Sequence, residues 1–339
     1  MVKVSIILKT NRTNDNTSFK QWKEFKDYDN PLIDDAYEFM IKNYFDCDSF
    51  IEPTIKSLID SEFQDFELII VHRHPEVIKD VVSKYTNKIK IKLIKEKWSP
   101  WHDLEGSYPT ISNAINTGVI WADGDIIVST DDCVIFPPKL LGELSEYIVM
   151  PKAIKYYIID DYVDAHNTVW VKKDKYRDIL KEENLIRKVW GEWNLLYGYC
   201  VVIPTNEMLK LNGFNESLDG AMGEEDGEFS IRVKERFDTE RLPATNPIYM
   251  FGHDYSNVKD GWNGTRDNIK WRKMIDKYFR ANLKRPSDEL CNKYKQWHER
   301  KYGKVDKYFD TCKKVPTFNL KKLRKLRGTN DKLTGKRIL

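Results

Sequence analysis

The chain has 339 residues, a formal net charge of +3 at pH 7, 41% hydrophobic residues and 32% charged residues. This composition is typical of a folded protein with one large or two modest domains. No apolar run approaches the roughly 20 residues that a membrane-spanning helix requires, which excludes an integral membrane protein built from such helices.

Apolar strands alternate with helices along the first half of the chain. Short β-branched segments are typical of buried parallel strands, and the segments between them have apolar residues at helical spacing. The predicted strands are 3–10, 66–72, 88–96 and 124–130, and the predicted helices are 49–63, 75–86 and 110–122. This order predicts an α/β fold with a doubly wound, mostly parallel sheet, which binds ligands at the carboxyl ends of its strands.

Two segments depart from this alternation. Residues 13–50 are polar and aromatic, too long for an ordinary loop, and are interpreted as a lid or an acceptor-facing insertion. We expect a domain at 1–260 that includes this insertion, followed by a basic, mainly helical segment at 261–339. The last twenty or so residues are expected to form a short amphipathic helix with a flexible end.

The charge is distributed unevenly. Residues 265–339 hold 24 Lys and Arg against 8 Asp and Glu, a net charge of +16, whereas the rest of the chain is acidic. This polarity predicts a basic segment that meets a polyanion, either an anionic membrane surface or a nucleic acid.

The segment "GDIIVSTDDC" ends a predicted buried strand with two adjacent carboxylates, Asp131 and Asp132. An acidic pair at such a place is costly unless a positive charge lies on it, which predicts a divalent cation and a diphosphate. The alternative is that both residues belong to an ordinary turn before Pro137.

The order of "VSIILKTNR", "NAINTGVIWADGDIIVSTDDC", "LNGFNESLDGAMGEEDGEFSIR" and "FGHDY" resembles the GT-A fold (Rossmann-like) glycosyltransferases, especially the large inverting family with a D-x-D motif. The resemblance covers roughly residues 1–255. It implies that Asp132 binds Mn²⁺ or Mg²⁺ at the phosphates of a nucleotide-diphosphate sugar. It also implies that Asp131 contacts the metal through water or contacts the ribose of that donor.

The same resemblance assigns roles to the segment "GEEDGEF". Asp226 matches the general base that deprotonates the acceptor hydroxyl, Glu225 would orient this base or the acceptor, and Glu224 is an additional acidic neighbour at the acceptor. A helix N-terminus favours carboxylates in any protein, so an ordinary acidic first turn is the alternative. His253 matches a late metal ligand of this fold, and a structural histidine is the alternative.

Donor contacts are implied at several strand ends, with two departures from the family pattern. Arg73 stands where the family has an aspartate that pairs with uracil, so the base is left open. Ile115 replaces an arginine that contacts the diphosphate. The implied donor-binding residues are Thr10, Asn11, Arg12, Arg73, Asn116 and Asp131.

Four tryptophans lie on probable loops near the site. All four are expected to bind the acceptor, with Trp98 and Trp101 on a loop beside the donor, because aromatic faces pack against sugar surfaces or bases. Packing in the core is the alternative for both pairs.

The leading hypothesis is therefore a metal-dependent, inverting glycosyltransferase that uses a nucleotide-diphosphate sugar, UDP-linked as the first expectation, in surface glycan synthesis. A viral enzyme that glycosylates hydroxylated DNA bases is the alternative. A nucleotidyltransferase would need a glycine-rich loop, which "KTNRTNDN" lacks, and a non-catalytic binder is a further alternative. Five scattered cysteines without a C-x-x-C pair indicate a reducing, cytoplasmic location, with membrane contact through the basic segment.

Overall fold

The computed structural model describes the central sheet, most of its helices and the C-terminal segment. The described residues are 3–10, 44, 47, 49, 51–103, 110–132, 134–144, 149–150, 153–155, 162–165, 169–172, 200–219, 225–234, 240–241, 248–250 and 314–339.

The largest sheet has eight strands in the order β11-β6-β10-β4-β1-β2-β3-β13. Its centre consists of four parallel strands, whereas β10 pairs antiparallel to β4 and β13 antiparallel to β3. The strands are β1 (Val4–Thr10), β2 (Phe66–His72), β3 (Ile91–Lys95), β4 (Ile126–Asp131), β6 (Val149–Met150), β10 (Cys200–Pro204), β11 (Glu240–Arg241) and β13 (Lys336–Arg337). The predicted mostly parallel α/β sheet is confirmed, because all four strands expected from the sequence lie at its centre.

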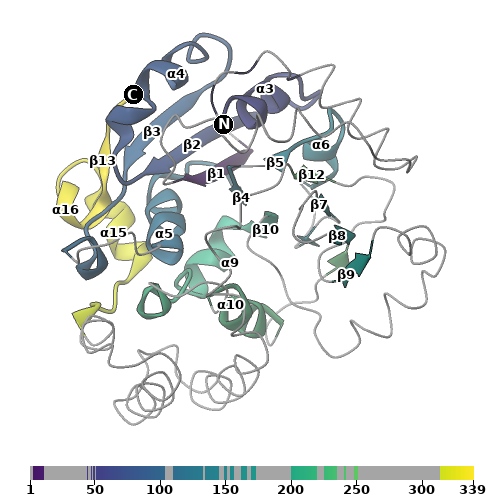
Figure 1. Cartoon of the computed structure of the whole chain (residues 1–339). Coiled ribbons are helices and arrows are strands. Elements are labelled where there is room, and N and C mark those ends of the chain that lie inside the picture. The colour runs from purple at the N-terminus through teal and green to yellow at the C-terminus, as the bar shows by residue number, and fades with distance from the viewer. Residues whose placement is uncertain are drawn as a thin grey trace.

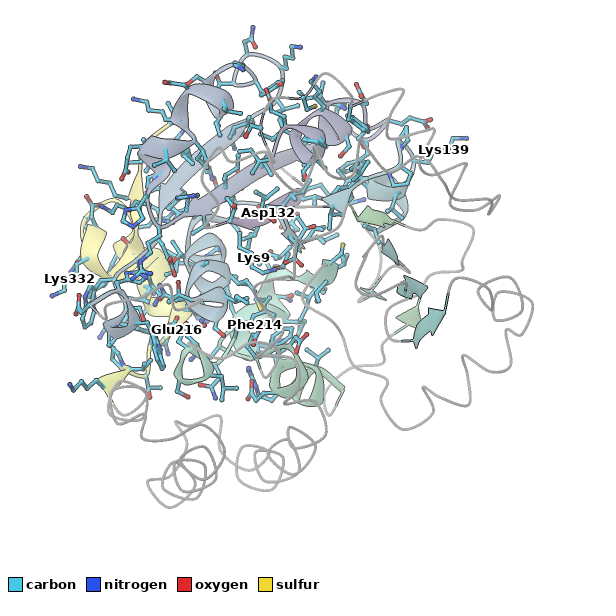
Figure 2. The ribbon with its side chains drawn as sticks, viewed as in Figure 1. Lys9, Asp132, Lys139, Phe214, Glu216 and Lys332 are labelled. Carbon is cyan, nitrogen blue, oxygen red and sulfur yellow. The ribbon has the colours of Figure 1, made fainter. Side chains whose placement is uncertain are left out.

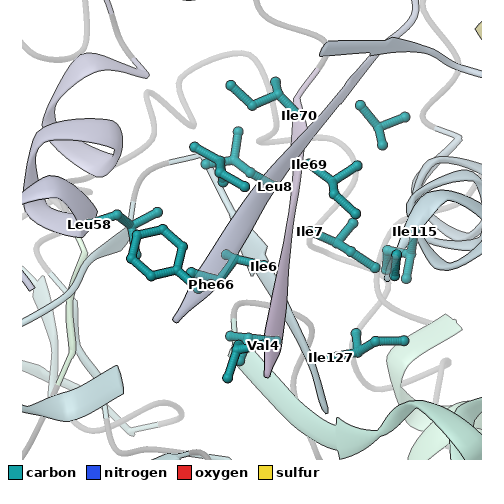
Figure 3. Close-up of a cluster of buried hydrophobic side chains, with 14 of the residues drawn as sticks. Val4, Ile6, Ile7, Leu8, Leu58, Phe66, Ile69, Ile70, Ile115 and Ile127 are labelled. Carbon is teal, nitrogen blue, oxygen red and sulfur yellow. The ribbon is translucent and has the colours of Figure 1, made fainter. Parts of the chain in front are cut away.

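Helices cover both faces of the central strands (Figure 1). Leu58 and Ile115 lie on opposite sides of β1 and β2, and both are fully buried (Figure 3). Gly118 allows one of these helices to pack closely, since a Cβ there would lie 2.3 Å from a methyl carbon of Ile7. The helices around the large sheet are α3 (Glu52–Ile59), α4 (Lys79–Ser83), α5 (Ile111–Trp121), α6 (Leu140–Leu144), α9 (Thr205–Lys210) and α10 (Glu225–Lys234), with single 3-10 turns η1 (Pro75–Val77), η2 (Pro100–Asp103) and η4 (Glu216–Leu218).

A second sheet of five short strands has the order β5-β12-β7-β8-β9. Its members all come from residues 134–250. They are β5 (Val134–Ile135), β7 (Ala153–Lys155), β8 (Tyr162–Ala165), β9 (Val169–Lys172) and β12 (Ile248–Met250).

The C-terminal segment is part of this architecture. It forms α15 (Leu320–Leu326) and α16 (Asp331–Thr334), and then β13, which extends the large sheet at β3. The expectation of a flexible end was therefore wrong, because backbone pairing with β3 holds the final residues. The predicted amphipathic helix is present as α15, but its apolar residues Leu320 and Leu323 are buried in the hydrophobic core.

Two arginines of the C-terminal segment cap the end of α5. Arg324 donates a hydrogen bond to the carbonyl of Val119 at 2.9 Å, and Arg327 lies 2.7 Å from the carboxylate of Asp123. Cations at a helix C-terminus stabilise its free carbonyls and complement its dipole. Part of the positive charge of this segment thus has a structural use.

Other expectations are met in part. The helix expected over 75–86 is divided into η1 and α4. Of the insertion 13–50, Tyr44 and Cys47 are buried in the core, and its interpretation as a lid concerns residues that lie outside the described ones. The boundary between 260 and 261 lies outside them as well. No helix in the described part of the chain is both long and apolar enough to cross a membrane.

A buried ion-pair network joins β2, β3 and the turn after α5. The Glu67 carboxylate is fully buried and lies 2.8 Å from the ammonium of Lys92 and 3.0 Å from that of Lys90. It also accepts hydrogen bonds from the hydroxyl of Ser5 and the amide of Asp123. Burial alone would raise the pKa of Glu67, but these partners outweigh it and hold the pKa below its ordinary value of 4.5.

We expect Glu67→Gln to lower the free energy of unfolding by about 3 kcal/mol at pH 7, since it removes the buried charge that balances Lys92 and leaves this ammonium with Asp123 and the carbonyl of Trp121. The lowered pKa means that this contribution is present above pH 4.5 and is lost as the pH falls through the folded-state pKa. Urea unfolding at neutral and acidic pH measures both effects.

The matched control is Glu207→Gln, which breaks a surface ion pair with Lys210 and should cost under about 1 kcal/mol. Equal losses for the two variants would contradict the importance of the Glu67 network.

Candidate active site

The central parallel strands end at one edge of the sheet, where polar residues gather. Strand pairing places Lys9 beside Asp131, Thr10 beside His72, and His72 beside Lys95. Figure 2 shows Lys9 and Asp132 next to each other at this edge. It is the position at which open α/β sheets bind ligands.

The acidic pair makes direct contacts with the end of β1. Lys9 forms an ion pair with Asp131, and the hydroxyl of Thr10 donates a 2.6 Å hydrogen bond to Oδ2 of Asp132. The backbone carbonyl of Asp132 accepts a hydrogen bond from Thr54 of α3. Asp132 is 5% exposed, so its carboxylate is held in a fixed place by two neighbouring elements.

This arrangement fits a divalent cation through Asp132. Carboxylate oxygens are the ligands that Mg²⁺ and Mn²⁺ prefer, and a diphosphate would supply further oxygens. Among the described residues no group of three or more His, Cys, Asp and Glu surrounds a common point. Asp132 would therefore be the protein ligand from this part of the chain, because Asp131 already faces the ammonium of Lys9.

Arg73, which follows β2, donates a hydrogen bond to the carbonyl of Trp101 at 3.3 Å. Trp101 is fully buried, and the backbone of Trp98 binds Lys332 of α16, whose ammonium lies 4.9 Å from the Trp98 ring centroid. Trp101 is therefore packed in the core, which was its alternative role, whereas Trp98 is half-buried against Lys332, and a sugar contact of either ring stays a prediction.

Asn116 has a structural role in the observed fold. Its amide donates to the carbonyl of Phe214 and to Oε1 of Glu216, both at 2.8 Å, and accepts from the amide of Phe214 at 2.9 Å. Both amide hydrogens are used inside the protein, which argues against the donor contact implied by the family resemblance. The residue ties α5 to the segment 211–219.

Segment 211–219 makes a tight turn that carries the motif "NGF". Asn212 and Gly213 both have positive φ, 59° and 68°, and a Cβ at Gly213 would lie 2.2 Å from Asn116. Asn212 also binds the C-terminal segment, donating to the carbonyl of Phe318 and accepting from the amide of Leu320. This turn therefore connects α5, α9 and α15.

A buried lysine completes this connection. Sequence reasoning did not identify it. Lys97 is fully buried, lies 2.6 Å from the carboxylate of Glu216, hydrogen-bonds to Asn113 and stacks 4.0 Å from the Phe318 ring centroid. Figure 2 shows Glu216 and Phe214 near the lower end of α5. The motif "NGFNE" contains Glu216, but the sequence does not indicate that Lys97 is its partner.

Asp219 caps the N-terminus of α5 from 107 residues away. Its two carboxylate oxygens accept hydrogen bonds from the amides of Ser112 and Asn113 at 2.8 and 3.1 Å. Burial, and then the charges of Glu216 and Glu96, raise the pKa of Asp219 well above its ordinary range. The charged form is thus costly here, although the helix amides favour it.

Glu96, the first residue after β3, is a second buried carboxylate that sequence reasoning missed. Its Oε1 accepts a 2.6 Å hydrogen bond from Asn113. Its Oε2 lies 3.4 Å from Nε2 of His102, and neither of these two atoms has a hydrogen-bond partner among the described residues. The pair lies beside Trp101, at the end of the sheet where Arg73 also lies.

The proposed base lies on α10, whose position is fixed by an arginine. Glu225 and Asp226 are in the first turn of α10, where the helix dipole favours carboxylates. Arg232 binds Glu228 with two hydrogen bonds and donates a third to the carbonyl of Leu211. The rings of Phe229 and Phe214 stack with centroids 4.0 Å apart. These contacts join α10 to segment 211–219.

Six of the sequence-derived site residues lie outside the described residues, and their roles stay predictions. They are Asn11, Arg12, Trp190, Trp193, Glu224 and His253.

We expect Asp219→Ala to lower the free energy of unfolding by about 2–3 kcal/mol, because two buried amides lose their acceptor. Asp219→Asn should cost less, about 1–2 kcal/mol at pH 7, since it removes a costly charge and keeps the acceptor of one amide, while its NH₂ group faces the other amide. The raised pKa also means that the cost of the charge disappears as the pH falls. Chemical unfolding of both variants checks this, and equal losses would contradict it.

Comparison with known proteins gives one family and several structures. Residues 41–204, just under half of the chain, match the family described as Glycosyl transferase family 2. A search of curated protein sequences gave no match.

Among solved structures, S. aureus TarS 1–349 in complex with UDP-GlcNAc has a TM-score of 0.49 at 14% identity, over 88% of this chain and 73% of that one. TarS 1–349 in complex with UDP gives 0.47 at 15% identity, over 88% and 72% of the two chains. Another TarS structure gives 0.45 at 13% identity over 90% of this chain, which spans only 44% of that one.

The family match begins before α3 and ends with β10, so it includes β4 and the two carboxylates that meet Lys9 and Thr10. The part of the chain that contains this strand end is thus similar to the family 2 glycosyltransferases, and its mostly parallel α/β sheet is the arrangement expected of their GT-A fold.

Proposed function

We propose that this enzyme transfers a sugar from a nucleotide-diphosphate sugar to an acceptor hydroxyl, with inversion at the anomeric carbon and with the help of Mn²⁺ or Mg²⁺. The observation that carries the proposal is the acidic end of β4, where Asp132 is buried and hydrogen-bonded by Thr10. UDP is the proposed nucleotide, following the family resemblance.

The residues of this chain have distinct tasks in the proposed reaction. Asp132, with His253 as a second ligand, would hold the cation, which supplies positive charge to the diphosphate as it leaves. Asp226 accepts the proton of the acceptor hydroxyl, which then attacks the anomeric carbon from the face opposite the diphosphate. Glu225 orients Asp226 or the acceptor, and the Arg232 contacts keep α10 in place.

The proposed acceptor is a surface glycan or its lipid-linked precursor, reached from the cytoplasmic side. Residues 314–339 contain nine basic residues and one acidic residue. Lys321, Lys322 and Lys325 of α15 are exposed, whereas Leu320 and Leu323 are buried in the core. Contact with an anionic membrane would therefore be electrostatic, without insertion of this helix.

A second candidate is the glycosylation of hydroxylated bases in viral DNA. The same exposed lysines favour this candidate, because cations on one helix also attract the phosphates of a DNA backbone. Nucleotidyl transfer and sugar-nucleotide binding without catalysis are not favoured by any contact at the strand ends.

We expect Asp226→Asn to reduce transfer by at least about a hundredfold and to leave donor binding unchanged, because it removes only the proton acceptor. Asp132→Asn should instead abolish the Mn²⁺-dependent part of UDP-sugar binding. A panel of UDP-sugars, tested by calorimetry with and without Mn²⁺ and by product formation, measures both. Asp331→Asn, on exposed α16, is the control, and full transfer activity of Asp226→Asn would contradict the proposal.

The two acceptor classes can be separated by binding. Vesicles containing anionic lipid should bind the enzyme more tightly than duplex DNA of equal phosphate concentration if a lipid-linked glycan is the acceptor. Replacement of Lys321, Lys322 and Lys325 by Gln should weaken the preferred interaction and reduce its salt dependence. Preference for DNA would support the second candidate instead.

A further inference from the structure

We propose that Lys9 is a resident cation of the donor site, which keeps Asp131 away from the metal ion and supplies part of the positive charge that binds the diphosphate. This inference rests on the proposed function for the identity of the donor. It goes further in predicting that removal of the Lys9 side chain strengthens metal binding and weakens nucleotide binding.

The position of Lys9 follows from the register of two strands. Lys9 is the penultimate residue of β1 and lies opposite Asp131, the last residue of β4, in a parallel pair. Residues opposite each other on neighbouring strands point to the same face of the sheet. Lys9 is only 9% exposed, and lysine is rarely so buried without an anionic partner. The ion pair with Asp131 is that partner.

This pairing changes what the acidic strand end offers to a metal ion. The charge of Asp131 is already balanced by an ammonium group, so a cation would have to displace Lys9 to use this carboxylate. Asp132 is the next residue, and its carboxylate accepts a hydrogen bond from the hydroxyl of Thr10. A divalent ion on Asp132 would still experience repulsion from the nearby ammonium. The geometry therefore predicts weakened metal binding through one aspartate.

The same ammonium favours a diphosphate. Two phosphates that enter at the carboxyl ends of β1 and β4 approach Lys9 directly, and an ammonium is a suitable point charge for phosphate oxygens. Lys9 can then share its protons between Asp131 and the phosphates without any metal. The enzyme should retain measurable nucleotide binding when divalent ions are removed.

The test uses Lys9→Met, which removes the charge and keeps the length of the side chain. Mn²⁺ alone, followed by the electron paramagnetic resonance signal of the free ion, should bind at least about tenfold more tightly to this variant. UDP in the presence of a chelator, measured by calorimetry, should bind at least about tenfold more weakly. Unchanged or weaker Mn²⁺ binding by Lys9→Met would overturn the proposal.

Asp131→Asn provides a second test that does not depend on the folding of the first variant. If Lys9 keeps Asp131 from the metal, this change removes one nearby negative charge but no metal ligand, so Mn²⁺ affinity should fall by less than about tenfold, and metal-free UDP binding should not weaken. A loss of Mn²⁺ affinity of about tenfold or more would identify Asp131 as a metal ligand and overturn the proposal.

Lys210→Met, which breaks a surface pair with Glu207, is the matched control and should leave both affinities unchanged. Mn²⁺ binding is measured without nucleotide, so the two hypotheses can fail separately. If no nucleotide binds under any condition, the proposed function fails. Tighter Mn²⁺ binding by Lys9→Met would still support the part of the inference that concerns the metal.

Discussion

The parallel pairing of β1 with β4 is the constraint on which the site depends. It places Lys9 opposite Asp131 and brings Thr10 to Asp132, so that charge and hydrogen bonding are arranged before any ligand arrives. A shift of one residue would turn these side chains to the other face of the sheet. The register is held by a core in which Ile7 meets α5 at Gly118, where no larger residue fits. Apolar packing thus determines the polar geometry of the site.

A second set of contacts connects the strand ends to α10, which carries the proposed base. Asp219 caps α5, Glu216 binds Lys97, and Arg232 joins α10 to the carbonyl of Leu211. Segment 211–219 is consequently attached to the helix that packs beneath β1 and to the helix that carries Asp226. Buried carboxylates are expensive, and each of these is bound by backbone amides or by a cation. The free-energy cost of burying these carboxylates is understandable if α5 and α10 must keep a fixed relative position during the proposed transfer.

The C-terminal segment joins the same framework. Asn212 binds its backbone, Arg324 and Arg327 cap α5, and β13 covers the outer edge of β3. An exposed sheet edge is prone to pair with other chains, and β13 reduces this hazard by replacing the edge of β3 with a two-residue, charged edge strand. Some cations of the segment are therefore used inside the fold, and the exposed lysines of α15 are the ones that the proposed contact with a polyanion would use.

The sequence by itself determined the sheet, its central strands and the acidic end of β4, because hydrophobic periodicity and strand order are local properties that the observed β1, β2 and β4 obey. It also indicated Asp226 at a helix start. Only the tertiary structure decided that Asn116 serves the fold, that Lys97 and Glu216 meet inside it, and that the last residues form an edge strand. These contacts join residues about 100 or more positions apart, as with Lys97 and Glu216, or Asn212 and Leu320. Composition and spacing cannot indicate which charged residues, distant in sequence, will be buried next to each other, since that depends on how the helices and strands pack.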